Sequence, residues 1–301
     1  MKILIIGANG FIGSYVAEMF NNVGHQVIGW GRFKGKVKSL DVKRVNLLNL
    51  EEVRNGLIYD RPDIIIDCVG SADVHKSVEN PLIDFDGNVK TTHNLLFALY
   101  KSGFLNTKVV FLSSAAVYGN PKSLPINENA ELHPLSPYAL HKVMAEDICR
   151  YFVDVYDMDI KILRIFSAYG IGLKKQIFWD MYNKAGKNDK LNMFGTGLES
   201  RDFINITDVV EAIFLITMRA KKEDVIFNVA NGEEVLIKTA VEIFAENFGV
   251  AKEKIYFNGD EREGDPKNWK ADISKLKMLG YTQQISIEHG IKAYVEWAKE
   301  F

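Results

Sequence analysis

The sequence predicts an α/β fold in which a doubly wound parallel sheet is followed by a smaller C-terminal mixed α/β region. Short Ile- and Val-rich runs without polar alternation, typical of strands buried on both faces, alternate with longer helical patterns. A glycine-rich loop follows the first of these runs. After Tyr169-Gly170 the regular alternation of strands and longer helices ends, which indicates a second, smaller region.

The elements of the first part follow one another as strand, helix, strand and helix. The predicted strands are Lys2–Ile6, Gln26–Trp30, Asp63–Val69, Lys108–Leu112 and Asp159–Ile165. The helical patterns between them cover Ile12–Val23, Leu50–Tyr59, Pro81–Gly103 and Pro137–Tyr156. Because helical crossovers join parallel strands and cover the faces of the sheet, we expect a parallel sheet with helices on both sides.

The last part of the chain shows shorter strands between amphipathic helices. We expect strands at Phe203–Ile206 and Val225–Val229, and a helix that begins at Thr207 with this residue as its N-cap. Further helices are predicted around Lys175–Ala185, Ile237–Phe248, Asp272–Leu279 and Ser286–Lys299. This pattern is typical of a small mixed α/β substrate-binding region.

Composition and charge exclude several classes of protein. Hydrophobic residues make up 47% of the chain, charged residues 25%, and the formal net charge is -2, whereas a nucleic-acid-binding protein normally shows a basic excess. The apolar opening Met1–Ile6 is too short for a signal peptide or a membrane span. The 6 histidines show no metal-ligand spacing. We therefore expect a cytoplasmic enzyme without a nucleic-acid, membrane or metal partner.

The glycine-rich loop between the first predicted strand and helix points to a dinucleotide. Glycine is needed where the backbone turns sharply or approaches a pyrophosphate, and the helix N-terminus offers unpaired N–H groups to the phosphate. The three-three spacing of the glycines differs from the usual two-three spacing, so a structural tight turn is the alternative. The candidate cofactor-binding residues of the loop are Gly7, Asn9, Gly10, Phe11, Ile12 and Gly13.

The end of the second predicted strand bears on the choice of cofactor. An acidic residue there would bind the ribose 2′-hydroxyl of NAD, but the chain has Gly31 followed by Arg32. A small residue followed by arginine leaves room for a 2′-phosphate and supplies a charge to meet it, which favours NADP over NAD. The alternative is that Arg32 belongs only to a solvated basic loop with Lys34, Lys36 and Lys38.

Tyr138 and Lys142 stand four residues apart, and the pair Ser113-Ser114 ends an apolar run earlier in the chain. If Pro137 opens a helix, this spacing puts the phenol and the ammonium on one face. The cation should then lower the pKa of the phenol, so that Tyr138 becomes a usable acid or base near neutral pH. For an isolated pair an exposed helical contact is the alternative, but the glycine loop and the serines favour a catalytic set.

These motifs together resemble the extended short-chain dehydrogenase/reductase family, in its nucleotide-sugar epimerase/dehydratase branch. The resemblance covers nearly the whole chain and rests on the glycine loop, Tyr138, Lys142 and the segment 113–119. It implies a Rossmann-like fold. It also implies that Tyr138 exchanges a proton with the sugar hydroxyl while hydride passes between sugar and nicotinamide, that Lys142 binds the nicotinamide ribose, and that Ser114 hydrogen-bonds the reacting oxygen.

Other segments extend the resemblance to the substrate. The segment 81–89 is similar to the family's helix with a structural asparagine, here Asn88. The segments 201–203 and 262–266 are similar to C-terminal signatures of the family, which implies that Arg201 and Arg262 lie near the diphosphate of the substrate. Ser167 stands where the family usually has a substrate-binding asparagine.

Departures from the family pattern narrow the range of reactions that this chain could catalyse. Dehydratases of this branch carry an Asp-Glu pair after the active-site hydroxyl residue, and Ala115-Ala116 stands here instead, so a 4,6-dehydratase is excluded. A nucleotide-sugar 4-epimerase is favoured. An NADPH-dependent reductase of a nucleotide 4-keto-6-deoxy-sugar is the first alternative, and a non-catalytic NADP-sensing protein is the second. Asp67 departs from the family's usual His-x-Ala-Ala.

The resemblance also predicts the organisation of the whole chain. We expect a dinucleotide-binding domain over residues 1–170, to which residues 201–229 return, and a substrate-binding region over residues 171–301. Family members often pair through the two long helices predicted here at Pro81–Gly103 and Pro137–Tyr156. We therefore expect a homodimer.

Overall fold

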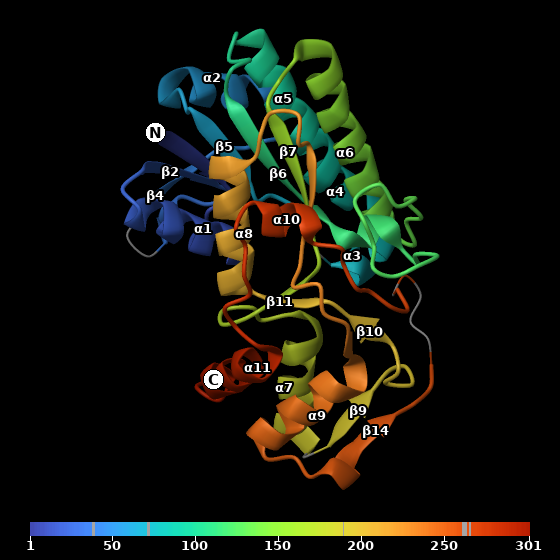
Figure 1. Cartoon of the computed structure of the whole chain (residues 1–301). Helices are drawn as coiled ribbons and strands as arrows, with labels where there is room; N and C mark the ends of the chain where they lie inside the picture. The colour runs from blue at the N-terminus through green and yellow to red at the C-terminus, as the bar shows by residue number, and fades with distance from the viewer. Residues whose placement is uncertain (38–39, 71–72, 189, 261–263, 265) are drawn as a thin grey trace.

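The larger part of the molecule is built on one twisted sheet (Figure 1). The computed structural model describes residues 1–37, 40–70, 73–188, 190–260, 264 and 266–301. The strands of the large sheet are β1 (Lys2–Ile6), β2 (Gln26–Gly31), β3 (Gly35–Val37), β4 (Leu40–Arg44), β5 (Ile64–Asp67), β6 (Lys108–Ser114), β7 (Ile160–Ile165) and β12 (Ile226–Val229). Their order across the sheet is β12-β7-β6-β5-β1-β2-β4-β3. Neighbouring strands are parallel except for β3, which pairs antiparallel with β4 at one edge.

Helices cover both faces of this sheet. They are α1 (Phe11–Asn22), α2 (Leu50–Asp60), α3 (Val74–Glu79), α4 (Pro81–Phe85), α5 (Thr91–Lys101), α6 (Pro137–Tyr156), α8 (Ile206–Arg219) and α10 (Ser274–Met278). Side chains alternate along β1, so that Ile3 and Ile5 join the core under α1 and α8, whereas Leu4 and Ile6 join the core under α2, α5 and α6. The predicted doubly wound α/β fold is confirmed.

The smaller part of the molecule surrounds a third apolar core. Its elements are β8 (Ser167–Tyr169), α7 (Gln176–Asn188), β9 (Leu191–Met193), β10 (Ser200–Arg201), β11 (Phe203–Asn205), β13 (Val235–Leu236), α9 (Ile237–Phe248), β14 (Ile255–Phe257) and α11 (Ile287–Ala298). The strands form the pairs β8–β11, β9–β14 and β10–β13. Short strands and packed helices thus form the mixed α/β arrangement predicted for this part.

The predicted long helix Pro81–Gly103 is divided in the structure. Between α4 and α5, residues Asp86–Lys90 form a π-helical turn. Side chains bind backbone carbonyls along this turn: Asn88 Nδ2 donates to the carbonyl of Asp84 at 3.0 Å, and Thr92 Oγ1 donates to that of Asn88 at 2.7 Å. Such π turns are frequent at functional sites, and this one carries the predicted structural asparagine.

One local prediction was wrong, and the structure also bears on the alternative of a basic loop. Asn205, not Thr207, caps α8, because its side chain accepts a hydrogen bond from the backbone N–H of Thr207 at 3.0 Å. The basic segment after Arg32 is not only a loop, since Lys36 lies in β3; Lys38 lies outside the described residues. Among the residues that the structure describes, no helix combines the length and the apolarity needed to cross a membrane.

Candidate active site

The glycine-rich loop forms a tight turn at the carboxyl end of β1. Gly7 has a φ of 79°, and its backbone N–H donates to the carbonyl of Trp30 in β2 at 2.9 Å. A Cβ on Gly13 would lie 2.3 Å from the carbonyl oxygen of Gly7, so α1 packs directly on the turn. Gly10 precedes α1, and within the described residues no side chain caps its first turn. The loop therefore presents backbone N–H groups at a helix N-terminus, as a pyrophosphate requires.

The other residues of the loop line its surroundings. A Cβ on Gly31 would lie 1.8 Å from Asn9 Oδ1, so the Asn9 amide fills the space beside Gly31 at the end of β2. Arg32 follows and is exposed. Phe11 and Ile12 are half-buried and pack against the core beneath α1. These contacts bring the glycine loop and the predicted 2′-phosphate position to the same edge of the sheet.

Ser114 and Tyr138 meet between the end of β6 and the first turn of α6. Ser136 caps α6, accepting from the backbone N–H of Ala139 at 3.2 Å. The backbone N–H of Tyr138 donates to Ser77 Oγ of α3 at 3.1 Å. The Tyr138 phenol is buried, and the neighbouring Ser114 hydroxyl acts to lower its pKa. The structure thus brings together the two hydroxyls that the sequence singled out.

Lys142 lies one helical turn further along α6 and is also buried. Its Nζ donates to the carbonyl of Leu112 at 2.9 Å and lies 4.8 Å from the centre of the Phe111 ring. Burial lowers its pKa, and the carboxylates of Asp67 and Asp84 oppose this shift. An ammonium has three donors, so the contact with Leu112 leaves N–H groups for other acceptors.

The electrostatics of Tyr138 differ from the sequence prediction. Burial raises the pKa of Tyr138 to about 12, the hydrogen bond with Ser114 opposes this shift, and the Asp84 carboxylate adds to it. The sequence predicted instead that Lys142 would lower this pKa. The reason for the difference is that spacing along a helix says nothing about burial, and here the desolvation of the phenol is the largest influence.

Asp67 is a buried carboxylate that sequence reasoning noted only as a departure from the family. It ends β5, where Oδ1 accepts a hydrogen bond from the backbone N–H of Val69 at 3.1 Å. Burial raises its pKa to about 6, while Val69 and Lys142 act in the opposite direction. Asp67 therefore brings an acidic group from the end of β5 close to the Lys142 ammonium of α6.

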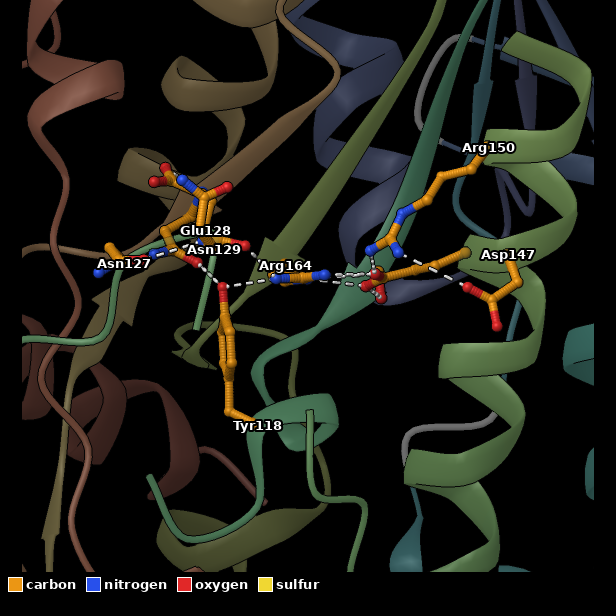
Figure 2. A network of polar contacts seen from close by, with 10 residues as sticks. Tyr118, Asn127, Glu128, Asn129, Asp147, Arg150 and Arg164 are labelled. Atoms are coloured by element: carbon orange, nitrogen blue, oxygen red, sulfur yellow. Dashed lines mark hydrogen bonds and ion pairs between the residues drawn. The ribbon is translucent and has the colours of Figure 1, made fainter. Parts of the chain in front are cut away.

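A buried polar network behind α6 was not predicted (Figure 2). The Arg164 guanidinium on β7 donates to Glu146 on α6, with the shortest contact at 2.6 Å, and to Tyr118 Oη at 2.9 Å. Glu146 also accepts from Ser113 Oγ at 2.6 Å. A glutamate one turn after Lys142 and an arginine inside an apolar strand are the sequence signals that could have indicated this pair. The network ties the helix that carries Tyr138 and Lys142 to the strand that carries Ser114.

The predicted substrate-binding residues lie in the smaller part or at its border. Ser167 begins β8, and its backbone N–H donates to the carbonyl of Asp202 at 3.0 Å. The Arg201 guanidinium donates to the carbonyls of Ser200 at 2.8 Å and Lys267 at 3.2 Å, and it lies 5.6 Å from the Trp269 ring. Arg262 lies outside the described residues.

Comparisons with known proteins agree with this arrangement. The sequence profile of the NAD dependent epimerase/dehydratase family matches residues 3–230. The UDP-glucuronate 4-epimerase of Thermodesulfobacterium geofontis is 30% identical over 99% of this chain and 96% of its own. The crystal structure of UDP-glucose 4-epimerase from Thermotoga maritima with UDP-glucose superposes with a TM-score of 0.90 at 27% identity, over 100% of this chain and 99% of that one. The UDP-glucuronic acid 4-epimerase of Bacillus cereus, in complex with UDP-glucuronic acid and NAD, gives a TM-score of 0.89 at 26% identity, over 100% and 99% of the two chains.

Proposed function

The chain belongs to the NAD dependent epimerase/dehydratase family, and from this membership we propose that it is a nucleotide-sugar 4-epimerase that uses NAD or NADP. Full-length similarity to UDP-sugar 4-epimerases supports this activity. The observation that carries the proposal is the meeting of Ser114 and Tyr138 at the end of β6, with Lys142 one turn away on α6. The cofactor loop fits the dinucleotide, because Cβ atoms at Gly7 and Gly13 would fill the turn.

We propose that these three residues carry out the proton chemistry at C4 of the sugar. A bound nicotinamide would supply reversible hydride transfer at C4 of the sugar. Tyr138 takes the proton of the C4 hydroxyl and later gives it back, and Ser114 holds the reacting oxygen in place. Lys142 uses its remaining N–H groups to bind the ribose hydroxyls next to the nicotinamide.

For the substrate we propose a nucleotide diphosphate sugar, with a UDP-sugar as the first candidate because the similar proteins act on UDP-sugars. Arg201 would bind the diphosphate, since a guanidinium can donate two parallel hydrogen bonds to phosphate oxygens. The Arg201 guanidinium contacts two backbone carbonyls and the Trp269 ring, which supports a fixed orientation of this group. Arg262 is proposed for the same diphosphate, and Ser167 for a sugar hydroxyl.

A panel of nucleotide sugars tests the function. The purified chain is incubated with UDP-, GDP-, dTDP- and CDP-sugars, with and without added NADPH, and the products are separated by chromatography. We expect interconversion of C4 epimers without net consumption of cofactor, and loss of turnover by at least about 100-fold in Tyr138→Phe, the lower range for a lost acid-base catalyst. Stoichiometric consumption of NADPH would point to the reductase instead. Unchanged turnover in Tyr138→Phe would contradict the catalytic assignment.

We further propose that the chain prefers NADP. Gly31 and the exposed Arg32 support this preference, because they place no acid and one cation at the end of β2. Arg32→Ala should weaken NADP binding by about 10-fold or more, the scale of one charge-assisted hydrogen bond, and leave NAD binding unchanged. Lys34→Ala, two residues on, is the control. Equal affinity of the unaltered chain for NAD and NADP in calorimetry would contradict this preference.

We also propose a homodimer that pairs through α4, α5 and α6. Large apolar side chains are exposed on this surface: Leu82, Ile83, Leu140, Met144, Tyr151 and Val155. A hollow of about 410 Å³ between α5 and α6 is lined by aromatic rings. Exposed apolar patches of this kind are typical of protein interfaces. For the domain organisation we propose a dinucleotide-binding domain over residues 1–170 with residues 201–229, which the pairing of β12 with β7 supports, and a substrate-binding region over residues 171–301.

A further inference from the structure

A buried acid–imidazole pair lies directly beside the candidate catalytic residues. Helices α4 and α6 pack side by side (Figure 1). Between them, Asp84 Oδ2 of α4 lies 2.7 Å from His141 Nδ1 of α6, and the two side chains are only 3% and 10% exposed. The edge of the imidazole meets the Phe85 ring, with 5.5 Å between ring centres. From the sequence, His141 is only one of 6 histidines without metal-ligand spacing, and no partner is predicted for it.

The pair lies beside both functional groups of α6. His141 is three residues after Tyr138 and directly precedes Lys142. The Asp84 carboxylate raises the pKa of both Tyr138 and Lys142. The second carboxylate oxygen, Oδ1, is buried and has no hydrogen-bond partner among the described residues. Among the described residues, the Asp84 carboxylate therefore has no hydrogen-bond donor other than His141. Its negative charge is little compensated nearby, so its electric field reaches Tyr138 and Lys142.

The groups that act on Tyr138 and Lys142 come from four elements. Tyr138 is affected by Ser114 at the end of β6 and by Asp84 of α4. Lys142 is affected by four groups: Asp67 of β5, Asp84 of α4, and Cys149 and Glu146 of α6. Among these, Asp84 is the one carboxylate that influences both Tyr138 and Lys142.

We propose that Asp84 is a positioning residue whose negative charge, fixed in place by His141, sets the pH range in which Tyr138 acts as a base. The effect on catalysis rests on the proposed function, in which Tyr138 takes a proton from the substrate. A nearby negative charge disfavours the phenolate, so Asp84 keeps the pKa of Tyr138 high. Without this charge the phenol loses its proton at lower pH.

The experiment compares two variants that disturb the same contact. Asp84→Asn removes the charge and keeps the shape, whereas His141→Gln disturbs the contact and keeps the carboxylate. The rise of kcat with pH is measured for each variant. We expect Asp84→Asn to move this rise to lower pH by on the order of one unit, the scale of one neighbouring buried charge. His141→Gln should not move it to lower pH.

A matched control removes a carboxylate from the same segment. Asp86 lies two residues further on, is about one-third exposed, and lies 3.7 Å from Lys90 Nζ. Asp86→Asn should leave the pH profile in place. If Asp84→Asn and His141→Gln lowered kcat alike at every pH without displacing the profile, Asp84 would have only a structural role, and the inference would be wrong.

A second readout does not depend on turnover. The part of the phenolate absorbance that disappears in Tyr138→Phe belongs to Tyr138, and its appearance during alkaline titration reports the pKa of this residue. In Asp84→Asn it should appear at lower pH than in the unaltered chain, and an unchanged titration would overturn the inference. If the unaltered chain turned over no nucleotide sugar, the proposed function would fail while this titration still tested Asp84.

Discussion

Gly70 shows how closely a single residue is fitted to the candidate site. It has a φ of 144°, a conformation that favours glycine. A Cβ at this position would lie 2.9 Å from Lys142 Nζ and 2.6 Å from Asn88 Oδ1. The backbone after β5 therefore leaves no room for a side chain beside the ammonium, and any larger residue must displace it.

Gly70→Ala should reduce turnover by about 10-fold or more. The added methyl group would displace the Lys142 ammonium and so disturb the geometry of the reacting groups. Steady-state kinetics and a thermal unfolding curve separate lost activity from lost folding. Gly87→Ala is the control: a Cβ there would meet nothing within 4 Å, and alanine should stabilise the helical turn by about 0.5–1 kcal/mol. Equal activity of both variants would contradict the close fit of Gly70.

At the scale of residues, the sequence predicted which side chains belong to the site better than it predicted their burial and their partners. The spacing of Tyr138 and Lys142 correctly placed both on α6, since Pro137 does open this helix. The direction of the Tyr138 pKa shift was wrong, because it depends on burial. The pairing of Asp84 with His141 could not be predicted, because it joins residues 57 positions apart through tertiary packing.

One buried ion pair helps to anchor helix α6. Glu146 is fully buried and meets Arg164, whose side chain is 1% exposed. Replacing one partner of such a pair leaves the other charge buried without compensation. The pair therefore anchors the middle of the helix, after its catalytic first turns.

Glu146→Gln should lower the free energy of unfolding by about 3–5 kcal/mol, the cost of breaking a buried pair from one side. Asp147→Asn is the matched control, because Asp147 is 64% exposed and lies 3.6 Å from the Arg150 guanidinium. It should cost no more than about 1 kcal/mol. Chemical denaturation measures both values, and similar losses in the two variants would show that the pair does not anchor α6.

At the scale of elements, long regular segments were predicted well. The bounds predicted for β1, α6 and α9 agree with the structure. The π-helical turn was missed, because it depends on side-chain bonds such as that of Asn88. Strands β3 and β4 were missed as well, since their alternation of Lys with apolar residues is too short to stand out from a basic loop.

For the whole molecule, the exposed rings of α6 predict how two chains associate. Tyr151 is 53% exposed and lines the hollow between α5 and α6. Tyr151→Glu should convert the proposed dimer into a monomer, because a charge placed in an apolar interface loses its water. Sedimentation velocity measures the change. Tyr59→Glu on α2, outside this surface, should remain dimeric, and a monomeric unaltered chain would contradict the proposed interface.

The order of the strands could be expected only in part. Parallel pairing followed from the strand–helix alternation, but the place of β12 beside β7 follows from packing between residues far apart in sequence. Likewise, the core that α1 shares with α8 joins the first helix to one that begins near residue 206. Local patterns do not contain such information.

The pairing of β12 with β7 has a consequence for the biosynthesis of the protein. During translation β7, which is wholly apolar except for Lys161 and Arg164, emerges long before its partner at Ile226–Val229. At about 5–20 residues per second, the ribosome leaves this strand edge unpaired for on the order of seconds. An unpaired apolar edge is a template for association with other chains. The edge of β7 therefore stays open to such association until its partner strand has been synthesised.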